Sequence, residues 1–106
     1  MNMGEHEKDP ADTGINSRVL DQIIRLAKRH NLRQVLLFGS RARGDFKKVS
    51  DIDLAVSGGD ISGFALAVDE ETDTLLEFDV VNLDGRIQEE LIAEIRRDGR
   101  VLYEKA

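Results

Sequence analysis

The chain has 106 residues, enough for one domain with a modest core, and its 41% hydrophobic and 34% charged residues exclude a disordered or collagen-like protein. No cysteine is present, so disulfide frameworks and thiolate metal sites are excluded, and no apolar run approaches the ~18 residues of a membrane span. The formal net charge of −6 counts against non-specific nucleic-acid binding as the main task.

The N-terminal segment, residues 1–16, is polar and acidic. It lacks the apolar stretch of a secretory signal, and we expect a flexible tail followed by one domain over residues 17–106. The domain should open with a helix that follows Ser17, a suitable N-cap, and ends near His30, because apolar residues recur at helical spacing between them.

The middle of the domain predicts two strands around a short turn. Residues 35–38 form a continuous apolar run that stops at Gly39, and residues 41–44 can begin a helical turn. Residues 51–56 alternate acidic and apolar side chains, as a strand with one buried face does.

The C-terminal half predicts further alternation of helices and strands. We expect a helix over residues 61–72, a strand over 78–81, an amphipathic helix around 87–95 that Gly99 closes, and an edge strand over 101–103. This order indicates a small sheet with helices packed on it, although spacing alone does not determine the strand directions.

Charge is segregated along the chain. Residues 25–48 contain eight Lys or Arg and one acid, whereas residues 49–90 contain twelve acids and one Arg. Two readings stay open: two oppositely charged solvated faces, or one site with an anion-binding side and a cation-binding side.

The most informative motif joins a turn to a pair of acids. Gly39 and Ser40 follow the apolar strand, and backbone N–H groups and a hydroxyl at such a turn suit phosphate oxygens. Ten residues separate Ser40 from Asp51, and Asp51 and Asp53 stand at i and i+2 of a predicted strand. Two carboxylates so placed repel each other unless a cation lies between them, and oxygen-only ligands favour Mg²⁺.

A third acid, Asp79, points away from the core face of its strand because Phe78 and Val80 flank it. If its strand neighbours residues 51–56, Asp79 lies beside Asp51 and Asp53. Three acids around two metal ions about 3.5–4 Å apart suit in-line phosphoryl transfer, with Asp79 as the candidate base. Walker and dinucleotide-binding glycine motifs are absent, and neither His6 nor His30 is placed for a catalytic triad.

These three segments, residues 37–44, 50–54 and 78–81, resemble the minimal nucleotidyltransferases of the DNA polymerase β superfamily. The resemblance implies an α+β domain with a mixed sheet flanked by helices, which transfers a nucleoside monophosphate from an NTP such as ATP to an acceptor. It also implies that Gly39 and Ser40 hold the triphosphate. Asp51, Asp53 and Asp79 would then ligate two Mg²⁺ ions, with Mn²⁺ as the alternative, and Asp79 would activate the acceptor.

Two arginines of the same loop, Arg41 and Arg43, match the family and are candidate nucleotide-binding residues. The alternative is a structural role in which the guanidinium groups pair with acids and cap carbonyls. Tyr103 is predicted to pack on the edge strand, and Lys47 and Lys48 to be solvated.

The chain ends directly after its last predicted strand, so an open catalytic head of this size should need a second protein. Similar minimal proteins pair with a helical HEPN-domain toxin, and the resemblance implies a cytoplasmic antitoxin that transfers AMP to that toxin in a hetero-oligomer. Two alternatives stay open: an antitoxin that neutralises its partner by occlusion, and the catalytic subunit of a two-chain transferase acting on a small molecule or RNA.

Overall fold

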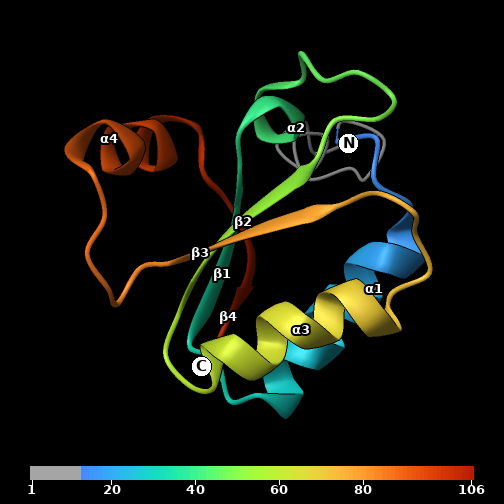
Figure 1. Cartoon of the computed structure of the whole chain (residues 1–106), viewed down its shortest axis with the longest axis vertical. Coiled ribbons are helices and arrows are strands. Elements are labelled where there is room, and N and C mark those ends of the chain that lie inside the picture. Colours follow the sequence, from blue (N-terminus) through green and yellow to red (C-terminus); the bar gives the residue numbers. More distant parts are fainter. Residues whose placement is uncertain (1–12) are drawn as a thin grey trace, which may run out of the picture.

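The computed structural model describes residues 13–106. Helices and strands alternate along most of the chain (Figure 1): α1 (Ser17–Arg29), β1 (Gln34–Phe38), α2 (Ser40–Arg43), β2 (Ile52–Ser57), α3 (Ile61–Glu71), β3 (Phe78–Asn82), α4 (Glu89–Asp98) and β4 (Arg100–Glu104). Within this part of the chain, no helix is both long and apolar enough to cross a membrane.

The strands form one four-stranded sheet in the order β3-β2-β1-β4. β1 is antiparallel to both of its neighbours, whereas β2 and β3 are parallel and are joined by α3. The sheet is therefore mixed and the domain is α+β, which confirms the predicted fold class. β4 is an edge strand, as predicted.

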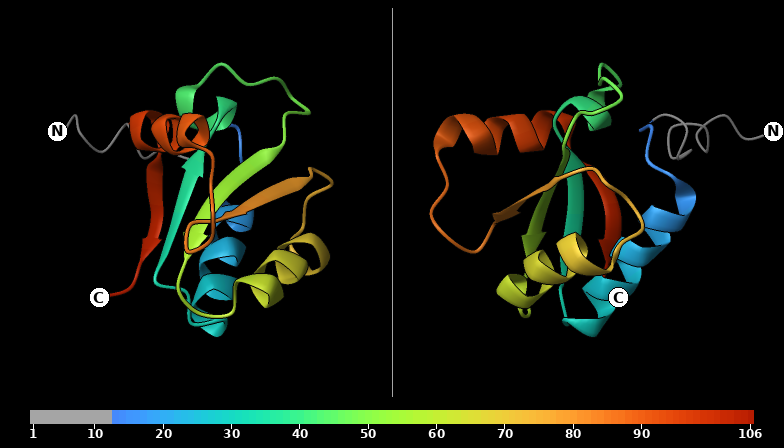
Figure 2. Two further views of the ribbon diagram at one scale, coloured as in Figure 1. Left: turned by 60° about the vertical axis from the view of Figure 1, so that its left-hand side comes forward. Right: turned by 45° about the vertical axis from the view of Figure 1, so that its right-hand side comes forward.

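The two faces of the sheet are covered unequally (Figure 2). α1 and α3 pack on one face, where alternate residues of β2, Ile52, Leu54 and Val56, are fully buried with Phe64 of α3. The opposite face carries a smaller cluster in which Ile95 of α4 packs near Phe38 and Ala55. Because side chains alternate along a strand, burying Ile52 and Leu54 against the larger core turns Asp53 toward the thinly covered face.

The start of the domain differs from the prediction. Asn16, rather than Ser17, caps α1: its side-chain oxygen accepts a hydrogen bond from the backbone N–H of Arg18 at 2.8 Å. Thr13 and Ile15 belong to the predicted tail, yet both are buried. The folded part therefore begins no later than Thr13, while the first twelve residues of the predicted tail lie outside the described residues.

Arg41 is the largest fully buried side chain of the described part, only 1% exposed. Its guanidinium donates hydrogen bonds to main-chain carbonyls of the preceding segment and of the α2–β2 loop: Thr13 (2.9 Å), Ser50 (3.0 Å) and Lys48 (3.1 Å). Burial lowers the pKa of Arg41, which nearby Asp51 and Asp53 oppose. This side chain therefore holds the loop over residues 44–51 in place.

We predict that Arg41→Met destabilises the domain by about 3–5 kcal/mol, because it leaves several buried carbonyl groups without a donor. Arg43→Met is the matched control, since Arg43 itself is exposed, and Asp98, the least exposed of its partners, keeps its ion pair with Arg97, so the loss should hardly move the unfolding midpoint. Urea unfolding followed by circular dichroism measures both. Equal stability of the two variants would show that the carbonyl network contributes nothing.

Candidate active site

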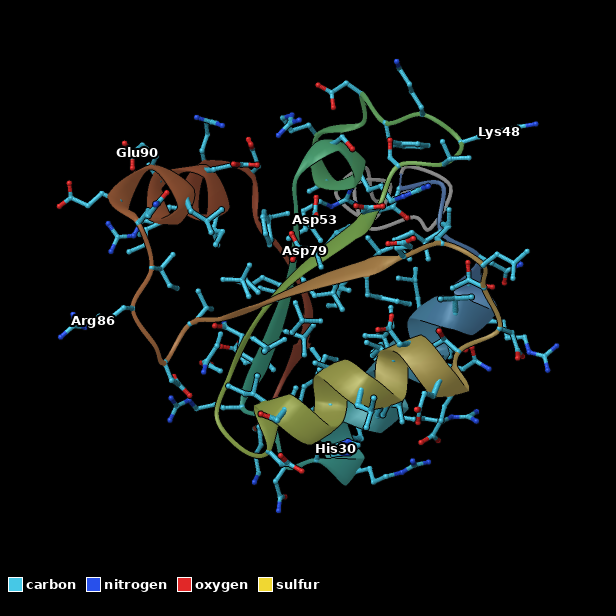
Figure 3. The ribbon with its side chains drawn as sticks, in the orientation of Figure 1. His30, Lys48, Asp53, Asp79, Arg86 and Glu90 are labelled. Atoms are coloured by element: carbon cyan, nitrogen blue, oxygen red, sulfur yellow. The ribbon has the colours of Figure 1, made fainter. Side chains whose placement is uncertain are left out.

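The structure brings two of the predicted catalytic acids side by side. Asp53 and Asp79 face each other in the parallel register of β2 and β3. Figure 3 shows both carboxylates at the end of the sheet nearest α2, directed to the same side. The condition under which Asp79 joins the site, that its strand neighbours β2, is therefore met.

Asp51 lies outside the strand, contrary to the prediction that it shares a strand face with Asp53. β2 begins at Ile52, whose backbone N–H donates to the Glu77 carbonyl at 2.9 Å, and Asp51 precedes it as an exposed residue. Its carboxylate nevertheless remains close enough to Asp53 to raise the pKa of that group.

Gly39 forms a tight support for Asp53. Its φ of 75° lies in the left-handed region, and a Cβ atom at this position would overlap the Asp53 carboxylate. The turn that Gly39 makes between β1 and α2 therefore touches the acid directly, and Ser40, the first residue of α2, follows it. Of the two residues predicted to hold a triphosphate, Gly39 therefore lies against Asp53, and Ser40 is the next residue along the chain.

The surroundings of Asp53 disfavour the ionised form of its carboxyl group. The pKa of Asp53 is raised to about 6, first by burial and then by the neighbouring carboxylates of Asp79, Asp51 and Glu94, while the guanidinium of Arg43 opposes the shift. Glu94 belongs to α4, some forty residues from Asp53 in sequence, and no signal in the sequence pointed to it. Its approach depends entirely on how α4 docks on the sheet.

The two predicted arginines separate. Arg41 is buried, and its guanidinium donates hydrogen bonds to main-chain carbonyls, which corresponds to the structural role given as the alternative to nucleotide binding. Arg43 is exposed and links α2 to α4, with ion pairs to Asp45 (3.2 Å), Asp98 (3.4 Å) and Glu94 (3.5 Å). Of the predicted nucleotide-binding residues, Gly39 lies against Asp53 and Arg43 pairs with Glu94, and the binding role of all of them stays a prediction.

Other sequence-based expectations concern residues remote from the acids. His30 lies at the opposite end of the molecule (Figure 3), where its ring nitrogen pairs with the Leu26 carbonyl at 2.9 Å, so it forms no triad with these acids. His6 lies outside the described residues. Tyr103 packs against the main core, and Lys47 and Lys48 are exposed, as predicted.

The donor set fits a hard divalent cation. Asp51, Asp53 and Asp79 offer only carboxylate oxygens, the ligands that Mg²⁺ prefers, and the crowding around Asp53 calls for positive charge. Among residues 13–106, however, no three carboxylate or imidazole side chains converge closely enough to form a metal cage. The three side chains therefore offer the oxygen ligands that Mg²⁺ prefers, but they do not converge closely enough to enclose an ion.

Comparison with known proteins identifies a family and a relative that this chain resembles in sequence. The family described as polymerase beta, nucleotidyltransferase matches residues 21–106. A protein of Methanocaldococcus jannaschii, named as a protein adenylyltransferase, is 36% identical over 84 residues, which cover 71% of this chain and 82% of that protein.

Solved structures extend the comparison. A chain from a toxin–antitoxin complex with AMP-PNP is 27% identical with a TM-score of 0.61, over 81% of this chain and 73% of that one. A chain from the toxin–antitoxin complex MntA-HpeT, carrying a tyrosine-to-alanine substitution, is 25% identical with a TM-score of 0.65, over 86% and 74%.

The raised pKa of Asp53 predicts a pH-dependent stability. An aspartate in the unfolded chain ionises near pH ~3.9, whereas Asp53 in the folded state keeps its proton up to pH ~6. As the pH rises from ~4 to ~6 the unfolded state releases this proton more readily, so the stability of the folded state falls, and it stays lower above pH ~6. In EDTA at pH 7, Asp53→Asn should therefore stabilise the domain by about 1–2 kcal/mol, a figure reduced for partial solvent screening, and the gain should vanish below pH ~4.

Urea unfolding at pH 7 and pH 3.5 checks this expectation, with Asp69→Asn on the exposed surface of α3 as the matched control. A variant that is equally destabilised at both pH values would contradict the proposed charge crowding.

Proposed function

The chain belongs to the polymerase beta nucleotidyltransferase family, and from this premise we propose that it is a Mg²⁺-dependent adenylyltransferase that modifies a protein partner and thereby acts as an antitoxin. The observation that carries the proposal is the group formed by Asp53, Asp79 and Gly39: two carboxylates in register on paired strands, with a glycine turn against one of them.

The choice of ATP and of a protein acceptor is supported by the relatives. One is named as a protein adenylyltransferase, and one similar chain comes from a complex with the ATP analogue AMP-PNP. Both similar structures are toxin–antitoxin complexes, which supports a toxin as partner. We propose that this toxin partner is a helical HEPN-domain protein and that the two proteins bind each other in the cytoplasm.

The proposed reaction follows from the placement of the residues. The triphosphate is placed at the turn of buried Gly39 and half-buried Ser40, where the lack of a side chain on Gly39 leaves its backbone open to close approach by phosphate oxygens. The acceptor oxygen forms a bond to the α-phosphorus while the bond to the β-phosphate oxygen breaks, so that pyrophosphate leaves. The hydroxyl proton passes to the carboxylate of Asp79, the candidate general base.

Mg²⁺, held by Asp51, Asp53 and Asp79, would neutralise the charge of the triphosphate and of the leaving pyrophosphate. The protein's own contribution is positional. The β2–β3 register sets the spacing of Asp53 and Asp79, and Gly39 fixes the distance between Asp53 and the phosphate turn.

The proposal predicts the effect of Asp53→Asn on transfer. Asn keeps the shape of the side chain and removes one anionic ligand, so the transfer rate should fall by a factor on the order of 10²–10³. Mass spectrometry of the partner after incubation with ATP and Mg²⁺ measures the added AMP, and Asp69→Asn should transfer normally.

The same variant separates catalysis from occlusion. If silencing of the partner requires transfer, Asp53→Asn still binds the partner and no longer silences it. Full silencing by Asp53→Asn, with no mass added by the parent protein from any of the four NTPs, would contradict the enzymatic proposal and favour occlusion.

A further inference from the structure

A groove opens beside the predicted catalytic acids. It has a volume of about 570 Å³ and runs between the α2–β2 loop and the α3–β3 loop, which Figure 1 shows on the same side of the molecule. Val49 contributes from the first loop and Leu75 from the second, while Asp51 and Glu77 line it at the strand ends. The groove therefore includes one of the acids assigned to the reaction.

Both rims carry large aliphatic side chains in full contact with solvent. Val49 is 80% exposed and Leu75 is 103% exposed, the two highest values among the exposed large hydrophobic residues of the described chain. Single exposed apolar residues are ordinary on a protein surface, but two that line one groove form an apolar surface that another protein's side chain can cover.

The exposure of these side chains comes from fixed loops. The loop that carries Val49 is held by the buried Arg41, which donates to the carbonyls of Lys48 and Ser50 on either side of Val49. The hydroxyl of Ser50 also accepts from the backbone N–H of Lys47 at 2.8 Å. Val49 is thus presented outward by a loop that is secured at both of its neighbours.

The opposite rim is secured by α1. Asp73 forms an ion pair with Arg18 at 3.0 Å, accepts from the side chain of Gln22 at 3.0 Å, and donates its backbone N–H to that same side chain at 2.9 Å. Leu76, next to Leu75, packs against the main core. Leu75 is therefore held away from the core by a loop that is anchored on both sides of it.

The order of residues across the site assigns the groove to the acceptor. Gly39, where the triphosphate is proposed to bind, touches Asp53, and Asp51 lies two residues from Asp53 and lines the groove. In-line transfer needs the attacking oxygen opposite the leaving pyrophosphate. The groove reaches the acids at Asp51 and is not lined by Gly39 or Ser40, so an acceptor bound there leaves the proposed phosphate turn free.

The charges of the acidic residues that line the groove narrow the class of acceptor. Asp73 is neutralised by Arg18, whereas within residues 13–106 no ion pair is formed by Asp51 or Glu77. With a divalent cation at Asp51, Glu77 remains as the uncompensated charge of the groove. An anionic nucleic-acid strand is disfavoured here, and a lysine or arginine next to an apolar side chain is favoured.

We propose that this groove is the acceptor-specificity site: it binds a protein segment in which a large apolar residue and an adjacent Lys or Arg lie next to the hydroxyl that receives the nucleotide. This inference rests on the proposed nucleotidyl transfer and adds to it the sequence preference of the acceptor. Val49 and Leu75 hold the apolar residue, and Glu77 pairs with the basic one.

Fluorescent ten-residue peptides test the proposal by anisotropy in the presence of Mg²⁺ and AMP-PNP. Each contains one serine; the first places leucine and lysine beside it, the second replaces lysine by glutamate, and the third replaces leucine by a small polar residue. We expect the first to bind at least tenfold more tightly than the other two. Combined Val49→Ser and Leu75→Ser should abolish the preference for leucine, and Glu77→Lys should reverse the preference between lysine and glutamate.

Leu66→Ser is the matched control, because Leu66 is 60% exposed on α3 and does not line the groove. It should bind the peptides as the parent does. Equal binding of all three peptides, or a leucine preference that survives the double substitution, would overturn the proposal, as would tighter binding of a ten-nucleotide RNA than of the first peptide.

A separate nucleotide-binding measurement distinguishes failure of the groove proposal from failure of the proposed function. Binding of a fluorescent ATP analogue with Mg²⁺ should change less than twofold in the double variant. A tenfold loss would assign the groove to the nucleotide and overturn its role as acceptor site. Failure of the parent protein to bind the analogue would instead contradict the proposed function, while a peptide preference that depends on Val49 and Leu75 would still establish the groove as a docking site.

Discussion

The placement of Asp53 opposite Asp79 is the constraint on which the rest of the site depends. The core sets it indirectly: Ile52 and Leu54 must face α1 and α3, so Asp53 between them must face the other way. A slip of β2 by one residue would bury the acid and expose the core. The same hydrophobic alternation that stabilises the sheet therefore positions the chemistry, and the charge crowding around Asp53 is a cost of that position.

The two loops beside the acids are stabilised largely by polar contacts, and Leu76 adds an apolar contact of the second loop with the core. Arg41 spans from α2 to the carbonyls of the α2–β2 loop, and its guanidinium lies 4.9 Å from the centre of the Phe46 ring. A buried guanidinium is costly unless every donor finds an acceptor, and main-chain carbonyls supply them here. Loops held in this way can present functional side chains to solvent without collapsing onto the core.

Much of the architecture follows from local patterns in the sequence. The apolar run before Gly39 and the acid–apolar alternation after Ser50 indicate strands correctly, and the spacing of Gly39, Ser40, Asp51 and Asp53 is enough to locate the candidate site. Local patterns do not contain the tertiary arrangement. This includes the order of the strands, the approach of Glu94 to Asp53, and the opposite environments of Arg41 and Arg43. The sequence alone does not distinguish the roles of two arginines that are separated by one residue, because these roles depend on the burial of each side chain.

The central claim is that the carboxylates of β2 and β3 form a site that accepts a nucleotide only together with a divalent cation. Titration calorimetry with AMP-PNP, in Mg²⁺ and then in EDTA, tests it most directly. Clustered acids without countercharge repel a triphosphate, so we expect binding in Mg²⁺ and none in EDTA. Equal affinity for AMP-PNP in both conditions would contradict the account.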